Sequence, residues 1–493
     1  MTIVRAAAFN SRMGSGLNRP AGHLELSTAL QPYTGSWDQR RAAHLLRRAG
    51  FGGTPDEVAS LSHMTPHDAV ESLIHFPDTS NLPAPENVYD PRPDLAGIRL
   101  MSDEQRRQTQ NASRKAQVES IASMQMWWLN RMLTTPAPLQ EKMTLFFQGH
   151  FTSAAVEKGV WPTYVWQQNQ LFRSNALGNL RDLTLAVSKD PAMLLYLDNA
   201  SSNKSHPNEN YARELMELFT LGHGNYSEED IRQSARAFTG WTLDRAAGAF
   251  TFNARIHDDG TKTFLGRSGD FDGADIVQII YQQPACSRFW SQTLLSFFVY
   301  NDPEPELVDA FARVIQRNDF ALAPSMSVLL RSNVFFSDRA YRALVKSPVE
   351  FVVGSHKAFG LPEIAMGTPR ALAAMGQILF HPPNVAGWPG GANWITSETM
   401  IARQNAVEAL VNSQMMARSS WMYGIPMDGT KAAQELAWAM LQGDVPAQSV
   451  AQLVAYLDGS GTSALAPLSV ENAQERIRGA AYLTAAMPTY QLA

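Results

Sequence analysis

The stretch Ser201–Gly222 reads SSNKSHPNENYARELMELFTLG, and its residue pattern predicts a helical fold. Pro207 suits the first position of a helix, because proline has no backbone N–H and its φ is already helical. His206 is then predicted as the N-cap residue. Asn208 and Glu209 fall in the first turn, where the helix dipole favours a carboxylate. The segment therefore predicts a helix that begins at Pro207.

The two sides of this helix differ in character. Its apolar stripe comprises Tyr211, Leu215 and Leu218. The opposite row has the i, i+4 spacing of a solvated salt-bridge ladder and comprises Glu209, Arg213 and Glu217. Glu214 lies at the edge of the apolar stripe, where a partly buried carboxylate needs a partner or a raised pKa. We therefore expect Glu214 to be partly buried and paired with a basic or histidine side chain, and Glu217 to be exposed.

Helical periodicity continues on both sides of this stretch. Thr54 and Glu57 form a capping-box signature. Further helical patterns cover residues 37–46, 102–133, 139–147, 171–187, 274–375 with breaks, and 399 to the end. Strand signals are confined to residues 248–270, where alternating residues around glycines predict a small β-hairpin-like insert. We predict an all-α protein with irregular Gly/Pro-rich loops, in which residues 1–36 form an extension and residues 37–493 one large helical domain.

Composition narrows the function classes. The 493 residues are 45% hydrophobic and 18% charged, with a net charge of −5, which indicates a globular protein and argues against a nucleic-acid binder that works by its overall charge. The single cysteine, Cys286, excludes an internal disulfide, so any metal would be held by His, Asp and Glu. We find no signal-peptide core and no apolar run of the ~18 residues that a transmembrane helix needs. The prediction is a cytoplasmic protein, with export alongside a signal-bearing partner as the alternative.

The start of the central helix is the first candidate site. In the functional interpretation, His206, Glu209 and Glu214 are catalytic or metal-binding groups, and Asn208 and Arg213 bind substrate. In the alternative interpretation, the same residues are a helix cap, a dipole partner and a structural ion pair. The absence of a strict metal motif such as H-E-x-x-H favours the structural interpretation on spacing alone.

Three further segments carry candidate residues. In KMTLFFQGHFTS, His150 is a metal-ligand candidate, although a histidine with aromatic neighbours is more often a core residue. In RIHDDGTKTFLG, His257 and Asp258 could bind a divalent cation beside Lys262, or simply stabilise a turn. The loop from His381 to Trp394 carries Asn384, Trp388 and Trp394, which could bind a sugar or peptide or pack between helices.

Several of these segments together resemble one bacterial family, domain of unknown function 1800. The matching pieces are HLLRRAGFGGTPDEV (44–58), KMTLFFQGHFTS (142–153), the long segment Asp190–Trp241, HDDGTKTFLG (257–266), KSPVEFVVG (346–354) and LFHPPNVAGWPGG (379–391). The resemblance implies a helical protein, often exported, and encoded beside a phosphatase- or sulfatase-like protein of a second uncharacterised family. This sequence departs from the family pattern in two places. A usual Trp-His-x-His-Phe reads FFQGHF here, and Phe219 stands where many members have histidine.

The resemblance implies that the scattered polar motif residues converge on one cleft. Three functions stay open. The first is an enzyme, perhaps a metal-dependent hydrolase or oxidoreductase, with His150, His206, His257 and Asp258 around a divalent ion. The second is a non-catalytic assembly partner of the phosphatase- or sulfatase-like protein. The third is a cell-envelope carbohydrate-binding module that uses Trp388 and Trp394.

Overall fold

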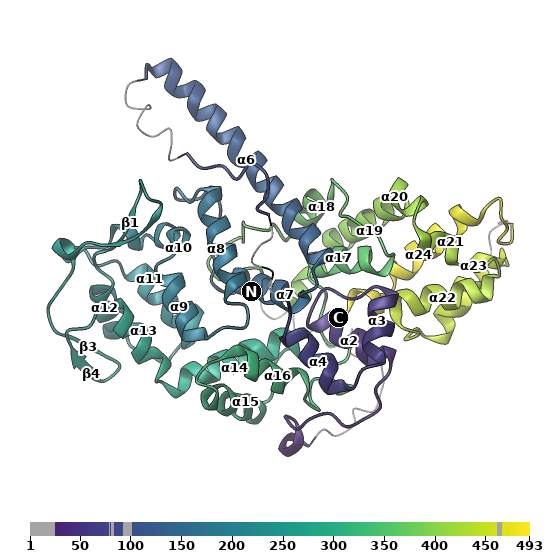
Figure 1. The fold of residues 1–493 in the computed structure, drawn as a ribbon, viewed down its shortest axis with the longest axis horizontal. Coiled ribbons are helices and arrows are strands. Elements are labelled where there is room, and N and C mark those ends of the chain that lie inside the picture. The colour runs from purple at the N-terminus through teal and green to yellow at the C-terminus, as the bar shows by residue number, and fades with distance from the viewer. Residues whose placement is uncertain (1–24, 78, 80–82, 92–100, 461–465) are drawn as a thin grey trace.

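The computed structural model describes residues 25–77, 79, 83–91, 101–460 and 466–493. Helices make up most of this part of the chain, and the strands form only small hairpins (Figure 1). Buried apolar residues from Ala29 to Tyr490 form one contiguous core cluster. The prediction of a mostly helical protein is therefore confirmed.

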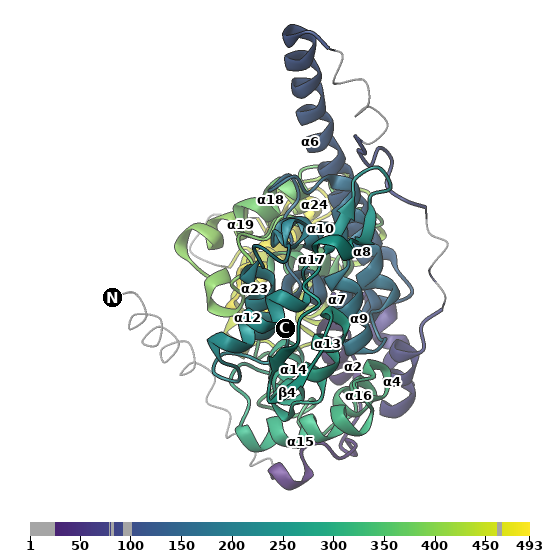
Figure 2. The same ribbon diagram turned by 90° about the vertical axis from the view of Figure 1, so that its left-hand side faces the viewer.

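The N-terminal part places short helices against the body and sends one long helix away from it. Its elements are η1 (Leu26–Thr28), α2 (Gln39–Arg48), α3 (Pro55–Ser62), α4 (Pro66–Ile74) and α6 (Asp103–Thr134). Helix α6 projects from the body in both Figure 1 and Figure 2. Its buried residues begin only at Ser120, because the sequence before that point is almost entirely polar.

Helices α6, α7 and α8 meet around a buried carboxylate. The central helices are α7 (Pro138–His150), α8 (Pro162–Ser174), α9 (Leu180–Ser188), α10 (Pro191–Tyr196) and η3 (Asn199–Ser201). Glu141 of α7 is fully buried and accepts hydrogen bonds from Trp128, Arg131 and Arg173. A buried charge needs such partners, so this network fixes how the three helices pack.

The segment after η3 differs from the prediction in its start and in its winding. Helix α11 (Glu209–Glu214) begins after Asn208, whose side chain accepts a hydrogen bond from the Asn210 backbone N–H at 2.9 Å. The prediction of His206 as N-cap is therefore wrong. Helix α11 continues directly into η4 (Leu215–Thr220), which is π-helical. The wider turn buries Met216 and Phe219 in addition to Leu215.

The predicted hairpin insert is present as two antiparallel hairpins after α12 (Glu228–Ala237). Strand β1 (Trp241–Asp244) pairs with β2 (Ala249–Phe252), and β3 (Lys262–Phe264) pairs with β4 (Arg267–Gly269), with η5 (Ala254–Ile256) between them. The first hairpin thus starts earlier than residue 248, because the alternation in Trp241–Asp244 belongs to it.

The remaining elements are helical. They are α13 (Gly273–Tyr281), α14 (Pro284–Phe298), α15 (Pro305–Arg317), α16 (Leu322–Leu330), α17 (Pro348–Ala358), α18 (Thr368–Ala374), η6 (Gly391–Trp394), α19 (Ser397–Val411), α20 (Gln414–Ala417), α21 (Ser420–Gly424), α22 (Gly429–Leu441), α23 (Ala447–Asp458), α24 (Ala473–Ala486) and η7 (Pro488–Gln491). Proline stands at the start of many helices of the fold, α7, α14 and α17 among them. The N–H that proline lacks would have no partner within the helix at that position, so the sequence indicates where these helices begin.

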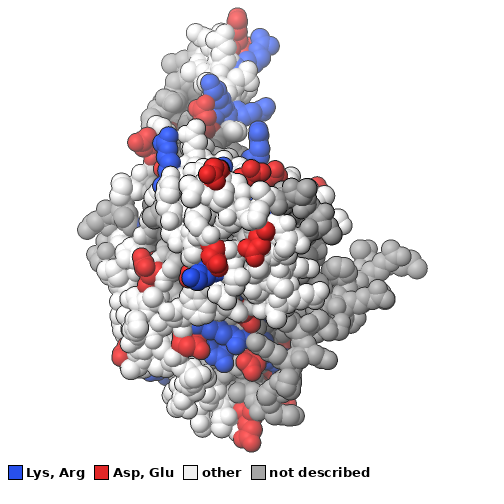
Figure 3. Space-filling view, turned by 90° about the vertical axis from the view of Figure 1, so that its right-hand side faces the viewer, with Lys and Arg blue, Asp and Glu red and all other residues white. Residues whose placement is uncertain are grey.

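Two properties of the surface follow from this arrangement. None of the helices formed by the described residues is long and apolar enough to cross a membrane. On the face shown in Figure 3, acidic and basic side chains are interspersed along the projecting part, with scattered charges of both signs below it.

Candidate functional site

A cleft of about 470 Å³ lies where three of the sequence motifs meet. The C-terminal end of α7 contributes Phe146, Gly149 and His150, and α14 contributes Gln292, Thr293, Ser296 and Phe297. The other walls are the segment Leu344–Ser347 with Glu350 of α17, Gln377, and the Pro/Gly-rich loop with Trp388 and Trp394. This volume lies in the range of small-molecule sites.

Close packing of two glycines holds the Pro/Gly-rich loop against α7. Gly387 has φ +83°, and a Cβ at this position would overlap the carbonyl group of Gly149. A Cβ on Gly149 would in turn lie 3.3 Å from the indole ring of Trp388. The absence of side chains at both positions therefore lets Trp388 reach the cleft beside His150.

His150 is held in one orientation by its neighbours. Its Nε2 lies 2.9 Å from the carbonyl oxygen of Phe219, at the end of η4, where helix carbonyls have no partner within the helix. The carbonyl can only accept, so Nε2 carries the proton and Nδ1 is left with a lone pair. The rings of Trp290 and Phe151 surround the imidazole. This burial lowers the pKa of His150 to about 4, so the side chain is neutral near pH 7.

Glu350 places a negative charge in the wall of the cleft. Its carboxylate pairs with the buried Lys142 of α7 and accepts a hydrogen bond from the Ser347 backbone N–H at 2.7 Å, closing a capping box at the start of α17. Although burial opposes ionisation, the Lys142 ammonium and these hydrogen bonds hold the pKa of Glu350 below its usual value. Glu350 is therefore an ionised structural carboxylate.

Neutral polar groups complete the lining. Gln377 is buried, and its side-chain oxygen accepts from the Val349 backbone N–H at 3.0 Å, which leaves its NH₂ group available. The indole N–H of Trp388 is buried and has no hydrogen-bond partner among the described residues. Asn301 is solvent-exposed. Asn384, predicted to bind substrate, does not line the cleft and instead accepts from the Ala386 backbone N–H in a turn.

The residues at the start of α11 are engaged in local interactions outside the cleft. His206 is exposed, and its backbone N–H is bonded to Asn203. Asn208 caps α11 and also donates to the Asp198 carbonyl at 2.8 Å. Arg213 forms a bidentate pair with Glu228 of α12 at 2.8 and 2.9 Å and lies 3.8 Å from Glu209. The pairing with Glu228 raises the pKa of Arg213.

The two carboxylates farther along this segment differ in part from the prediction. Glu214 is partly buried, but its carboxylate makes no hydrogen bond or ion pair with any described residue, so the predicted partner is absent. Burial and the nearby Glu217 raise the pKa of Glu214. Glu217, predicted to be exposed, is partly buried and accepts a hydrogen bond from the Tyr226 hydroxyl at 2.9 Å. The π-helical winding of η4 accounts for this change, because it rotates the residues after Glu214 away from an α-helical register.

His257, Asp258 and Lys262 belong to a polar cluster beside α12. The Nδ1 of His257 lies 2.7 Å from the Thr239 carbonyl oxygen. Asp258 accepts hydrogen bonds from Nε and Nη2 of Arg236, at 2.7 and 3.0 Å, and this pairing lowers the pKa of Asp258. Lys262 is fully buried and donates to the backbone oxygen of Asp258. The cluster joins the hairpin insert to α12, and none of its members lines the cleft.

These positions do not suit a metal ion. Within the ranges that the structure describes, no group of three or more His, Cys, Asp or Glu side chains could hold one. Of the four predicted ligands, His150 and His257 each use one ring nitrogen on a backbone carbonyl, Asp258 is saturated by Arg236, and His206 is exposed.

Of the predicted site residues, the structure places His150, Trp388 and Trp394 in this cleft. Sequence reasoning missed Glu350 and Gln377. The motif KSPVEFVVG gave a signal for Glu350, but Ser347 and Glu350 have the spacing of a simple capping box, which they also form.

The fold and the cleft define a mostly helical protein with an aromatic-walled cleft, which also carries amide and hydroxyl groups, between its α7, α14 and α17 helices. Residues 44–492 match the family described as "Protein of unknown function (DUF1800)", which covers nearly the whole chain. The protein belongs to this family, as the sequence motifs indicated. No curated protein and no solved structure matches the chain.

Proposed function

We propose that the protein binds a neutral, polyhydroxylated small molecule, such as a sugar, in the cleft between His150 and Trp388. The observation that carries this proposal is the composition of the lining. Aromatic rings form its apolar walls, and amide and hydroxyl groups supply neutral hydrogen-bond donors and acceptors. Sugars present apolar C–H faces together with many hydroxyl groups, and such a lining matches both.

The charges of the cleft favour a neutral ligand over an anion. No lysine or arginine is among the described residues that line it. Lys142 lies behind the wall and is already paired with Glu350. An anionic ligand would find no lysine or arginine in the lining to pair with, which is costly in a partly desolvated site.

The same groups favour binding over acid–base catalysis. An efficient general acid or base needs a pKa near the working pH. In this cleft the pKa of His150 is about 4, and that of Glu350 is lowered by Lys142, so neither exchanges protons readily at neutral pH. An enzyme with a His/carboxylate centre is therefore the weaker of the two functions.

The remaining predictions rest on the family resemblance and on the sequence. They are the partnership with a phosphatase- or sulfatase-like protein, the cytoplasmic location, and the division into an extension over residues 1–36 and one domain over residues 37–493. A sugar-binding cleft is compatible with each of them. Co-purification of tagged protein from its native host would test the partnership.

Calorimetric titration of the purified full-length chain with neutral mono- and disaccharides tests the proposed function, with the corresponding uronic acids as charged controls. Binding of a neutral sugar, weaker or absent binding of its uronic acid, and loss of binding in Trp388→Ala are expected. Asn301→Ala changes an exposed cleft residue with no hydrogen bond to a described residue, so it should weaken binding without disturbing the fold. Trp438→Ala, which alters an exposed tryptophan outside the cleft, is the matched control.

Two results would contradict the proposal. One is the absence of heat for every neutral sugar while the fold is intact. The other is chemical turnover of a sugar that is lost in Glu350→Gln, which would favour the enzyme instead.

A further inference from the structure

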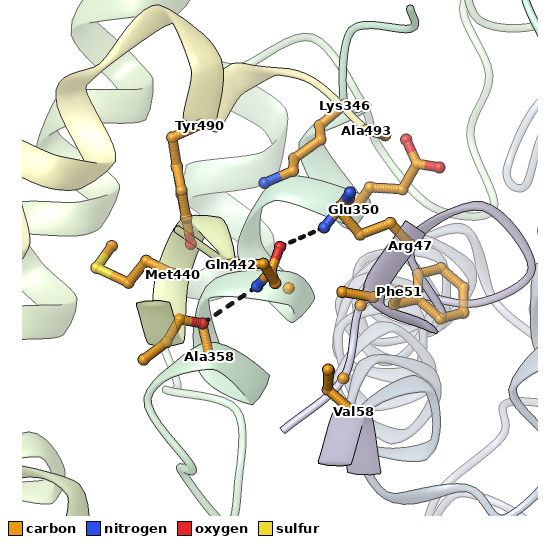
Figure 4. Close-up of a pocket in the computed structure, with 15 residues that line it drawn as sticks. Arg47, Phe51, Val58, Lys346, Glu350, Ala358, Met440, Gln442, Tyr490 and Ala493 are labelled. Atoms are coloured by element: carbon orange, nitrogen blue, oxygen red, sulfur yellow. Dashed lines mark hydrogen bonds between the residues drawn. The ribbon is translucent and has the colours of Figure 1, made fainter. Parts of the chain in front are cut away.

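Helix α17 borders further cavities in addition to the cleft. One has a volume of about 30 Å³, and Glu350 and Tyr490 are among its lining residues (Figure 4). Another, of about 180 Å³, lies on a different face of α17, and α18 and α19 supply its other walls. Ser355 lines this second cavity, and its hydroxyl group is hydrogen-bonded to that of Tyr490 at 2.8 Å. The second cavity shares no lining residue with the cleft or with the small cavity, so it is a separate site.

The lining of this cavity, called the apolar cavity below, is mostly apolar and carries no charge. Helix α17 contributes Phe351 and Val352, α18 contributes Ala371, and α19 contributes Val407 and Leu410. No Asp, Glu, Lys or Arg is among the described residues that line it. A charged ligand would lose its hydration there without gaining an opposite charge, which is costly. The lining therefore suits an uncharged ligand with an apolar body.

The apolar cavity has room for one ring and is reached from the surface. Apolar cavities of roughly 150 Å³ in other proteins hold a benzene molecule. Gly367, just before α18, and Ala409 of α19 line the cavity and are both exposed, so a ligand can enter on this side. Met366, next to Gly367, is 85% exposed. Its flexible apolar side chain can adapt to a ligand at the rim.

His356 brings an unused hydrogen-bond acceptor to this lining. The residue is 2% exposed, and its Nδ1 lies 2.8 Å from the carbonyl oxygen of Val352, one turn earlier in α17. The carbonyl can only accept, so Nδ1 carries the proton. Burial lowers the pKa of His356, so the ring is neutral near pH 7 and Nε2 keeps a lone pair. Nε2 is buried and has no hydrogen-bond partner among the described residues, a costly state that a donor from a ligand would relieve.

The two hydroxyl groups of the lining differ in how they are used. Ser355 donates to the Phe351 carbonyl at 2.7 Å and is bonded to Tyr490, so its hydroxyl is engaged within the protein. Thr368 is 5% exposed, and its side chain forms no hydrogen bond with a described residue. Its hydroxyl can rotate to donate or to accept. The polar groups left for a ligand are therefore the Thr368 hydroxyl and Nε2 of His356.

We propose that the apolar cavity binds a small uncharged molecule that consists of one aromatic ring with a hydroxyl or N–H group, such as a phenol. The ring packs against the apolar side chains of α17, α18 and α19, and its O–H or N–H donates to Nε2 of His356. Mostly apolar walls with a few polar groups are typical of small-molecule sites. This site is independent of the sugar cleft, so it does not rest on the function proposed above.

Fluorine NMR of small probes with the full-length chain tests the proposal. The probes are para-fluorophenol, fluorobenzene and para-fluorobenzoate. We expect saturable binding of the two uncharged probes, with para-fluorophenol bound about fivefold more tightly, the contribution of one hydrogen bond. The carboxylate of para-fluorobenzoate has no cation to pair with in the lining, so this probe should not bind.

Three variants locate the bound probe. Ala371→Leu places a larger side chain in the apolar cavity and should abolish binding of both uncharged probes. Ala373→Leu, at an exposed position of the same helix outside the lining, is the matched control and should leave binding unchanged. His356→Phe keeps a ring of similar size without the acceptor, so it should bind fluorobenzene as before and lose the preference for para-fluorophenol.

The wild type alone can overturn the proposal, whether or not a variant folds. The absence of saturable binding of either uncharged probe to the folded wild type would do so, and so would equal affinities for para-fluorophenol and fluorobenzene. Binding that persists unchanged in folded Ala371→Leu would also overturn it, because the probes would then occupy another part of the protein.

Discussion

Gly387 packs directly against the backbone of Gly149, and the contact leaves no space for a side chain on Gly387. Gly387 lies in the Pro/Gly-rich loop with φ +83°, and a Cβ there would overlap the Gly149 carbonyl at the end of α7. This contact joins two motifs that are more than two hundred residues apart in sequence. It also places Trp388 and His150 on the same cleft.

Gly387→Ala should destabilise the protein more than Gly390→Ala in the same loop. Both glycines have positive φ, +83° and +62°, so alanine is strained at either position. A Cβ on Gly390 meets nothing within 4 Å, whereas at Gly387 it overlaps backbone. Urea unfolding should show an additional loss of about 1–3 kcal/mol for Gly387→Ala, the usual cost of overpacking. Equal losses would mean that the loop shifts freely and does not fix the cleft.

Glu141→Gln should be among the most destabilising single changes in the chain. The carboxylate is fully buried, accepts a hydrogen bond from Trp128 and forms ion pairs with Arg131 and Arg173. Its removal therefore leaves two buried guanidinium groups without a counter-charge. The expected loss in free energy of unfolding is about 3–5 kcal/mol.

The control for this prediction is Glu119→Gln on the exposed part of α6. Glu119 pairs with Lys115 at 3.8 Å on the helix surface, where such pairs contribute little. Its loss should stay below about 1 kcal/mol. If the two variants unfold at the same urea concentration, the Glu141 network does not determine how α6, α7 and α8 pack.

Much of the fold was predictable because its boundaries are local. Thr54 and Glu57 form the capping box that their spacing indicates, and prolines mark the starts of α7 and α17. The π-helical turn of η4 was not predictable. Its winding is coupled to a tertiary contact, since the Phe219 carbonyl that it leaves free accepts from His150.

The candidate site was less predictable than the fold. His150 and Trp388 come from segments whose local patterns do not reveal that they meet, and the Gly149–Gly387 contact that joins them is tertiary. The acidic and histidine residues around α11 could be interpreted as a site from the sequence, because caps and ion pairs use the same residue types as catalytic sites. The position of Glu350 between two cavities was not predictable either, because a capping box alone explains its spacing from Ser347.

Asp190 should make stability decrease as pH rises toward neutrality. It caps α10 and is buried, accepting from Gln168 at 2.8 Å and from the Met193 backbone N–H at 3.0 Å, and burial raises its pKa to about 7. Between about pH 4 and pH 7 the folded state keeps a proton that the unfolded state has lost, so the free energy of unfolding falls by up to about 1.4 kcal/mol per pH unit.

Asp190→Asn tests this dependence, because asparagine keeps the acceptor oxygen and cannot titrate. Urea unfolding of both proteins at several pH values isolates the contribution of Asp190, since all other titrating groups cancel in the difference. The wild type should lose stability relative to the variant as the pH rises. Parallel curves would show that the folded protein ionises Asp190 at its ordinary pKa.

His150 should act on stability in the opposite direction and should remain neutral wherever the cleft binds its ligand. Burial lowers its pKa to about 4, so between that value and the unfolded value of about 6.5 only the unfolded state takes up a proton. The contribution of His150 to the free energy of unfolding is therefore fully present above about pH 6.5, and it is lost as the pH falls toward 4. Nitrogen NMR should show a neutral ring, protonated at Nε2 by the contact with Phe219, down to about pH 5.

The same titration separates binding from catalysis. If the lone pair on Nδ1 of His150 serves only as a hydrogen-bond acceptor, sugar affinity should be constant from about pH 6 to pH 8, because the charge of the ring does not change there. If His150 instead transfers protons, binding or turnover should follow a bell-shaped profile with a limb near pH 6–7. Such a profile, together with an imidazole that NMR shows protonated near pH 6, would contradict both the neutral state of the partly buried His150 and the proposed binding function.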